Sequence, residues 1–219
     1  MRKNRFIVLL VLGLLVCLTI TACSEKTTDS NISGSAVPGE KNEDPKADTP
    51  DIIITFDSVT DIIEFVSAAN SQETQFSEYA EKHDISKNVT YNAAKNFATD
   101  CGSTKVLCNK SDVVCDSFSG TYYSERDELS LIYKVDDITY RFIYTFGANT
   151  PYDYDSAPVL QGVKVGPFEL DLYQGDDRLV GFVIDGDTTI RIIVKAEQIS
   201  DINFEAFTVA NALSGNRNG

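Results

Sequence analysis

The chain has 219 residues, of which 33 are Asp or Glu and 19 are Lys or Arg, and its formal net charge is −14. Proteins that bind nucleic acid or anionic lipid through a basic patch cluster Lys and Arg on one surface, so this composition argues against both classes. A strongly acidic surface favours solubility and mutual repulsion instead.

The N-terminus combines a short basic stretch with an apolar one. Arg2, Lys3 and Arg5 precede Phe6–Ile20, a run of 15 residues without charge. This is the layout of a secretory signal peptide. A helix of 15 residues is about 22 Å long, shorter than the roughly 30 Å hydrocarbon core of a bilayer. A cleaved signal is therefore favoured, and an uncleaved membrane anchor is the alternative.

The apolar run ends in Ile20-Thr21-Ala22-Cys23. These residues resemble the lipobox of bacterial lipoprotein signal peptides, in which an aliphatic residue and two small residues precede a cysteine. The resemblance implies cleavage between Ala22 and Cys23 and thioether lipidation of Cys23. It also implies a protein anchored to the cell membrane and facing away from the cytoplasm. Two acyl chains suffice for stable anchoring. An ordinary secretion signal that happens to contain Cys23 is the alternative.

Three regions follow from this interpretation: a signal peptide over 1–22, the lipidated Cys23 with a disordered tether over 23–50, and one domain over 51–219. The tether is rich in Pro, Gly, Ser, Thr and charged residues and has no aromatic residue, so it cannot bury enough apolar surface to fold. A coil of this length spans roughly 30 Å. Removing residues 1–22 removes three basic residues and no acid, which leaves a charge of −17.

Helical patterns dominate the first part of the domain. After a short strand over Asp51–Phe56, Ser58 is a candidate N-cap for an amphipathic helix that buries Val59, Ile62, Ile63, Val66 and Ala69. A second helix is expected over Glu73–Lys82, and a third over 86–100.

From about Lys105 the apolar period changes to two, which indicates strands. Lys105–Leu107 and Asp112–Cys115 are short strand candidates, and Ser117–Gly120 has the composition of a turn. The clearest signal is a hairpin over 129–146. A two-residue loop at Asp136-Asp137 would place Val135 opposite Ile138, Tyr133 opposite Tyr140 and Leu131 opposite Phe142.

Four more strands are expected, over Val159–Val165, Phe168–Tyr173, Leu179–Ile184 and Thr188–Lys195. Three-residue loops would put Val180, Phe182 and Ile184 on the same face as Leu170, Leu172, Ile190, Ile192 and Val194. A final helix, capped by Ser200, is expected over Asp201–Leu213. The sequence thus predicts an α+β domain, with N-terminal helices packed on an antiparallel meander of six or more strands and a C-terminal helix.

The nucleophile and metal candidates are few. His83 is the one histidine, at the end of a predicted helix, and no nucleophile-elbow motif is present. Cys101, Cys108 and Cys115 lack a Cys-x-x-Cys pair, so no metal site is expected. These three cysteines allow one disulfide with one thiol left over, or three buried thiols.

Two tyrosines are the best binding candidates. Tyr152 and Tyr154 flank an aspartate in a loop and could stack on a sugar or hold a cationic peptide; the alternative is that they pack on the sheet edge. Paired aspartates occur in several loops, where their usual role is turn formation. No two carboxylates stand out as a glycosidase pair, no Gly-rich phosphate loop is present, and no cofactor is expected.

The sequence favours a non-catalytic domain that binds a protein or carbohydrate partner at the cell surface, tethered to the membrane through lipid on Cys23. A small extracytoplasmic hydrolase that uses carboxylates or a cysteine is the alternative enzyme. A further alternative is an accessory or sensory module of an envelope complex.

Overall fold

The computed structural model describes residues 51–110, 114–152, 154–210 and 213. The signal-peptide, lipobox and tether predictions, over residues 1–50, lie outside the described residues, as does the first half of the predicted strand over Asp112–Cys115. The second half, Val114 and Cys115, lies in no strand. None of the helices in the described ranges is long and apolar enough to cross a bilayer.

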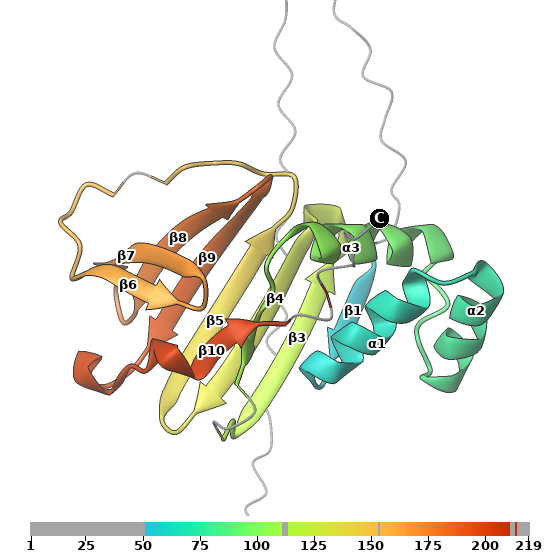
Figure 1. The fold of residues 1–219 in the computed structure, drawn as a ribbon, viewed down its shortest axis with the longest axis horizontal. Coiled ribbons are helices and arrows are strands. Elements are labelled where there is room, and N and C mark those ends of the chain that lie inside the picture. The colour runs from blue at the N-terminus through green and yellow to red at the C-terminus, as the bar shows by residue number, and fades with distance from the viewer. Residues whose placement is uncertain (1–50, 111–113, 153, 211–212, 214–219) are drawn as a thin grey trace, which may run out of the picture. The chain divides into compact units, whose positions relative to one another are not determined.

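An antiparallel sheet of eight strands organises the domain (Figure 1). Its spatial order is β1 (Ile53–Phe56), β3 (Ser117–Tyr123), β4 (Glu128–Val135), β5 (Ile138–Thr145), β9 (Thr188–Lys195), β8 (Leu179–Asp185), β7 (Phe168–Gln174) and β6 (Leu160–Val165). The sheet joins two meanders, β3–β4–β5 and β6–β7–β8–β9, which meet where β5 pairs with β9. The segment after β5 therefore carries the chain to the far edge of the sheet.

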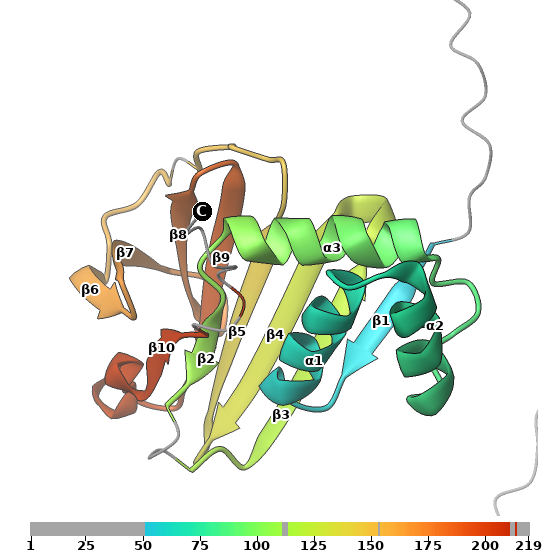
Figure 2. The same ribbon diagram turned by 45° about the vertical axis from the view of Figure 1, so that its right-hand side comes forward.

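Three helices lie at the β1 end of the sheet, where the first and third pack on one face and the second packs against these two beyond the edge strand (Figure 2). They are α1 (Val59–Ala69), α2 (Glu73–Lys82) and α3 (Tyr91–Ser103). Ser58 caps α1, accepting a hydrogen bond of 3.1 Å from the Asp61 amide, and Thr90 caps α3 through the Ala93 amide. The predictions for α1 and α2 are confirmed, and α3 lies a few residues later than expected.

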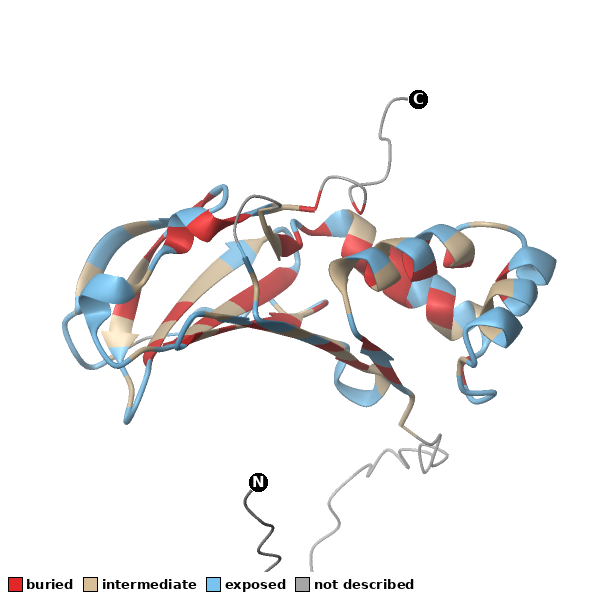
Figure 3. Ribbon diagram, turned by 90° about the horizontal axis from the view of Figure 1, so that it is seen from below, coloured by how far each residue is buried: buried red, intermediate tan, exposed pale blue. Residues whose placement is uncertain are grey.

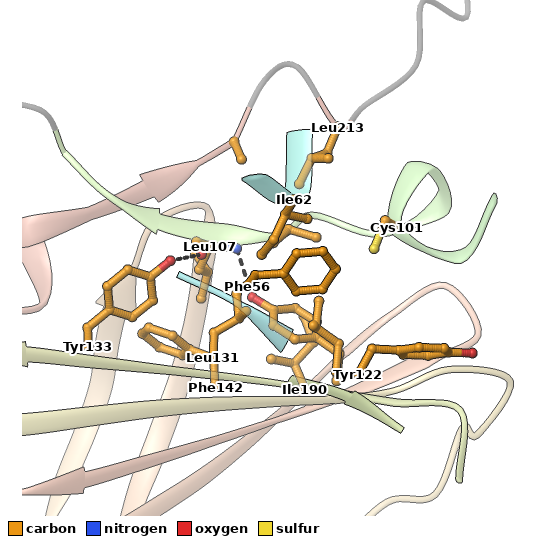
Figure 4. Close-up of a cluster of buried hydrophobic side chains, with 14 of the residues drawn as sticks. Phe56, Ile62, Cys101, Leu107, Tyr122, Leu131, Tyr133, Phe142, Ile190 and Leu213 are labelled. Carbon is orange, nitrogen blue, oxygen red and sulfur yellow. Dashed lines mark hydrogen bonds between the residues drawn. The ribbon is translucent and has the colours of Figure 1, made fainter. Parts of the chain in front are cut away.

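The core lies between the sheet and these covering elements (Figures 3 and 4). Near the helices it is aromatic: Phe65 is fully buried and makes edge-on contacts with Phe56, Phe76 and Phe97. Farther along the sheet, Tyr133, Tyr140 and Phe142 of the central hairpin pack against Phe207. Thirty-six buried apolar residues of the described part form one cluster, so helices and sheet share one continuous core.

The central hairpin has the predicted register. Val135 pairs with Ile138, Tyr133 with Tyr140 and Leu131 with Phe142. The two-residue turn requires Asp136 at φ +53°, a left-handed conformation that Asp tolerates better than most residues.

The predicted face of β8 is wrong. The β8–β9 loop is a two-residue turn at Gly186-Asp187, with Gly186 at φ +63°. Because the loop is one residue shorter than expected, every side chain of β8 is on the opposite face. Leu179, Gly181 and Val183 face the core, whereas Val180, Phe182 and Ile184 point to the outer face of the sheet, away from the helices.

The predicted C-terminal helix does not form. Two short 3₁₀ turns, Ile199–Asp201 and Phe204–Ala206, lead into β10 (Phe207–Val209), which pairs with β2 (Leu107–Asn109). Ser200 bonds to the Asp201 carboxylate instead of capping a helix. Tertiary packing overrides the helical pattern here, because an extended chain lets Phe207 reach the aromatic core while its backbone bonds to β2.

The segment over Ser117–Gly120 is a strand and not a turn, since it begins β3. Gly120 pairs with Phe56 of β1 on one side and Leu131 of β4 on the other, and a Cβ atom there would be 3.2 Å from Phe56 Cβ. The glycine thus serves strand packing and not chain reversal.

Candidate functional site

The two loop tyrosines stack on side chains of the outer sheet face. The ring centroids of Tyr152 and Phe182 are 4.1 Å apart, at an interplanar angle of 7°. The Tyr154 ring lies 4.0 Å from that of Tyr173 at 12°. We call Tyr152, Tyr154, Tyr173 and Phe182 the outer aromatic cluster. Both strand members come from positions whose side chains point away from the core, on β7 and β8.

The outer aromatic cluster is ordered but accessible. Tyr152 is 56% exposed, and the other three members are partly buried. Each near-parallel ring pair contributes about 0.5–1.5 kcal/mol beyond area burial, so the rings are held in place before any ligand arrives. The tyrosines pack on the outer face of β7 and β8 and not on the predicted sheet edge, and Tyr152 still presents its ring to solvent.

Arg191 of β9 adjoins the cluster. It is the cross-strand partner of Phe182, and its guanidinium is close enough to Tyr154 to influence that phenol. Burial raises the pKa of Tyr154, and the positive charge of Arg191 acts in the opposite direction. The Nε atom of Arg191 is buried and has no hydrogen-bond partner among the described residues. A buried N–H donor without an acceptor costs its desolvation free energy.

A groove of about 550 Å³ lies along α2 and the segment before α3. Its lining combines apolar side chains such as Phe76 and Val89 with four charged residues, Glu73, Glu81, Asp84 and Lys87. A hollow of this size can accept a small ligand or one side chain of a partner. No catalytic constellation lines it, and none of its residues belongs to the outer aromatic cluster.

The three cysteines are free thiols. Burial, with a smaller contribution from Asp100, raises the pKa of Cys101 well above its usual value, and burial raises that of Cys108. Since the thiolate is the nucleophile, neither thiol is activated. Cys115 donates to the Ser117 carbonyl oxygen at 3.0 Å.

His83 is the exposed C-cap of α2, as predicted, and stacks on Tyr79 with 4.3 Å between the ring centroids. Within the described ranges no hydroxyl or carboxylate bonds to its imidazole, and no group of three or more His, Cys, Asp and Glu side chains could hold a metal ion.

Asp100 is a carboxyl group with a strongly raised pKa. Burial, reinforced by the negative charge of Asp127, raises its pKa to about 6. Asp127 also accepts a hydrogen bond of 3.2 Å from the Tyr122 hydroxyl. Neither carboxylate lines the groove along α2.

Sequence reasoning identified Tyr152 and Tyr154 but missed Tyr173, Phe182 and Arg191. The signal that could have found them is Asp185-Gly186-Asp187-Thr188. Interpreted as a two-residue turn with Gly in a left-handed conformation, it places Phe182 and Arg191 together on the outer face.

No family model, no curated protein and no solved structure matches this chain.

Proposed function

We propose that this protein is a lipid-anchored protein of the cell envelope whose domain binds a ligand or partner without chemical conversion. The observation that carries the binding role is the outer aromatic cluster, in which an exposed Tyr152 is held flat against Phe182. Rigid, amphipathic rings at a surface provide contact area at low entropic cost. Anchoring is supported by the resemblance of Ile20-Thr21-Ala22-Cys23 to a lipobox, and it would keep the domain within reach of the envelope.

The anchor is tested with Cys23→Ala. The wild-type chain should partition into the detergent phase after membrane extraction, whereas the variant should stay in the aqueous phase or retain its uncleaved signal. A processed variant that still partitions with detergent would contradict lipid anchoring.

The binding role is tested by co-sedimentation of the purified full chain with isolated envelope fragments. Tyr152→Ala should reduce the sedimented fraction several-fold. Ile199→Ser is a matched control, because Ile199 is another exposed apolar residue (43%) that lies outside the cluster. Equal loss in both variants, or none in either, contradicts a role for the cluster.

The raised pKa of Asp100, with Asp127 nearby, favours one second candidate, a hydrolase with carboxylate catalysis. A carboxyl group whose pKa is raised toward neutral pH can act as a general acid. Release of reducing ends from envelope oligosaccharides by the wild type, and its loss in Asp100→Asn, would support this candidate over the binding protein.

A further inference from the structure

The outer face of the central sheet has a charge opposite to that of the whole chain. On β4, β5 and β9 the outward positions carry Lys134, Arg141, Arg191 and Lys195, against the carboxylate of Glu128. Lys195 pairs with Asp177, and β7 adds the outward carboxylates of Glu169 and Asp171 at the far side of this face. Over the whole chain acids outnumber bases, with 33 Asp and Glu residues against 19 Lys and Arg residues. A local cluster of cations on an acidic protein is a specific feature of this face.

Arg141 and Arg191 lie diagonally across the β5–β9 pair. Arg141 is opposite Ile193, and Arg191 is opposite Ile143, so the two Cα atoms are about 7–8 Å apart, within reach of long side chains. Ile143 points outward yet is only 2% exposed. Aliphatic stems of neighbouring arginines commonly cover such apolar surface and leave their guanidinium groups at the edge.

Among the described residues, the two guanidinium groups take part in few hydrogen bonds. Arg141 donates from Nε to the Ser130 hydroxyl at 3.0 Å; no other hydrogen bond of either group exists among the described residues. The ion pairs of these residues are Lys105–Asp185, Arg178–Asp177 and Lys195–Asp177, and they include neither arginine. Two guanidinium groups carry ten N–H donors between them, and within the described ranges only the Arg141 Nε–H has an acceptor, so the pair has donors to offer a ligand.

The outer aromatic cluster borders this arginine pair. Phe182 of β8 is the cross-strand partner of Arg191. Tyr173 and Arg141 lie at the two ends of the next line of cross-strand partners, with Val180 and Ile193 between them. Tyr152 adds an exposed ring over Phe182. The face thus combines flat aromatic surface, suited to the apolar side of a sugar ring, with paired guanidinium groups, whose planar forks match carboxylate and phosphate oxygens.

We infer that the outer sheet face binds an anionic glycan, with Arg141 and Arg191 holding its carboxylate or phosphate groups and Tyr152 stacking on a sugar ring. This inference rests on the proposed binding function and names its ligand class. A neutral glycan would leave the arginine pair without an acceptor, and a cationic peptide would be repelled by it.

The test measures binding to the purified full-length protein by calorimetry at low ionic strength. The probes are oligogalacturonate for carboxylates, oligo(glycerol phosphate) for phosphates, and a neutral glucan oligomer of similar length. At least one anionic probe should bind, with an affinity that falls as salt rises. Arg191→Gln and Arg141→Gln should each weaken binding at least tenfold. Lys87→Gln, which removes the same charge in the groove along α2, should change it less than twofold.

Each outcome separates the possibilities. Binding of one anionic probe alone identifies carboxylate or phosphate as the source of the charge. Equal binding of the neutral oligomer overturns the anionic ligand but leaves the binding function intact. Weakening by Lys87→Gln and not by Arg191→Gln overturns the sheet face in favour of the groove. Absence of binding to every probe overturns the glycan, and envelope co-sedimentation then decides separately on the proposed function.

Discussion

Gly181 of β8 lies directly beneath Leu172 of β7: a Cβ atom at position 181 would come within 2.6 Å of Leu172 Cδ2 and 2.5 Å of Leu170 Cδ1. The Asp171 carbonyl oxygen would be only 2.8 Å away. The β7–β8 ladder is confined to the pairs Tyr173–Val180 and Gln174–Leu179. Beyond these pairs, the side chains of β7 occupy the space that a side chain at position 181 would need. The β6–β7 end of the sheet depends on this contact.

Gly181→Ala should therefore destabilise the domain by about 1–3 kcal/mol, since the crowded atoms include backbone that cannot move aside easily. The measurement is equilibrium unfolding in urea. Gly102→Ala is the matched control, because the nearest atom to its Cβ would be the Leu213 carbonyl oxygen at 3.5 Å, and alanine is the better helix former. Equal midpoints for the two variants would contradict the close packing at Gly181.

Two buried phenols attach β2 to the main sheet. The Leu107 amide donates to Tyr144 Oη at 2.7 Å, and Tyr133 Oη donates to the Leu107 carbonyl oxygen at 3.1 Å (Figure 4). Tyr144→Phe leaves a buried N–H without an acceptor and should lower the free energy of unfolding by about 1–3 kcal/mol. Tyr133→Phe should cost less, because an unbonded carbonyl oxygen is tolerated better than an unbonded N–H. Thermal unfolding followed by circular dichroism ranks the variants, and the reverse order would refute this account.

Asp100 makes the stability fall as the pH rises. Its folded-state pKa of about 6 exceeds the usual value of about 3.9 for an unfolded chain, so the native state holds the proton more tightly. The penalty for ionising Asp100 therefore develops between about pH 4 and pH 6 and persists above. Asp100→Asn should stabilise the protein at pH 8 by about 1 kcal/mol, a figure reduced for solvent screening. At pH 3.5 the variant should show no such gain.

Asp185 has the opposite dependence. Burial alone would raise its pKa, but hydrogen bonds from the side chain and amide of Lys105, and from Thr104, hold the pKa below its usual value. The stabilisation is present above the unfolded-state pKa of about 3.9 and is lost as the pH falls through the lower folded-state value. Asp185→Asn should therefore destabilise the protein at pH 7 by about 1–2 kcal/mol.

The difference between wild type and Asp185→Asn should shrink as the pH falls below about 3.9 and through the lowered folded-state pKa of Asp185, because the wild-type carboxylate then becomes protonated. Asp177→Asn provides the comparison. Asp177 also pairs with two cations, Arg178 and Lys195, but at an exposed site, where ion pairs contribute little. A destabilisation by Asp185→Asn that is unchanged between pH 7 and pH 3 would show that charge is not its cause.

Local patterns were sufficient for much of the fold. The period of 3.6 with a Ser58 cap located α1, and alternation with a two-residue loop gave the register of the central hairpin. Such elements are predictable because near neighbours in the sequence specify them. Local sequence also identified Tyr152 and Tyr154 as binding candidates, because they are aromatic residues in a polar loop.

The sequence by itself determined the α+β class, the positions of most strands and the likeness of Ile20-Thr21-Ala22-Cys23 to a lipobox. Only the tertiary structure decided that Phe207 belongs to a strand and that Phe182 and Arg191 share the outer face with Tyr173. The physical reason is that these relationships depend on pairing between distant segments and on a one-residue difference in a turn. A single residue reverses every side chain of a strand, so the arginine pair and its aromatic border emerge only when the strands are aligned.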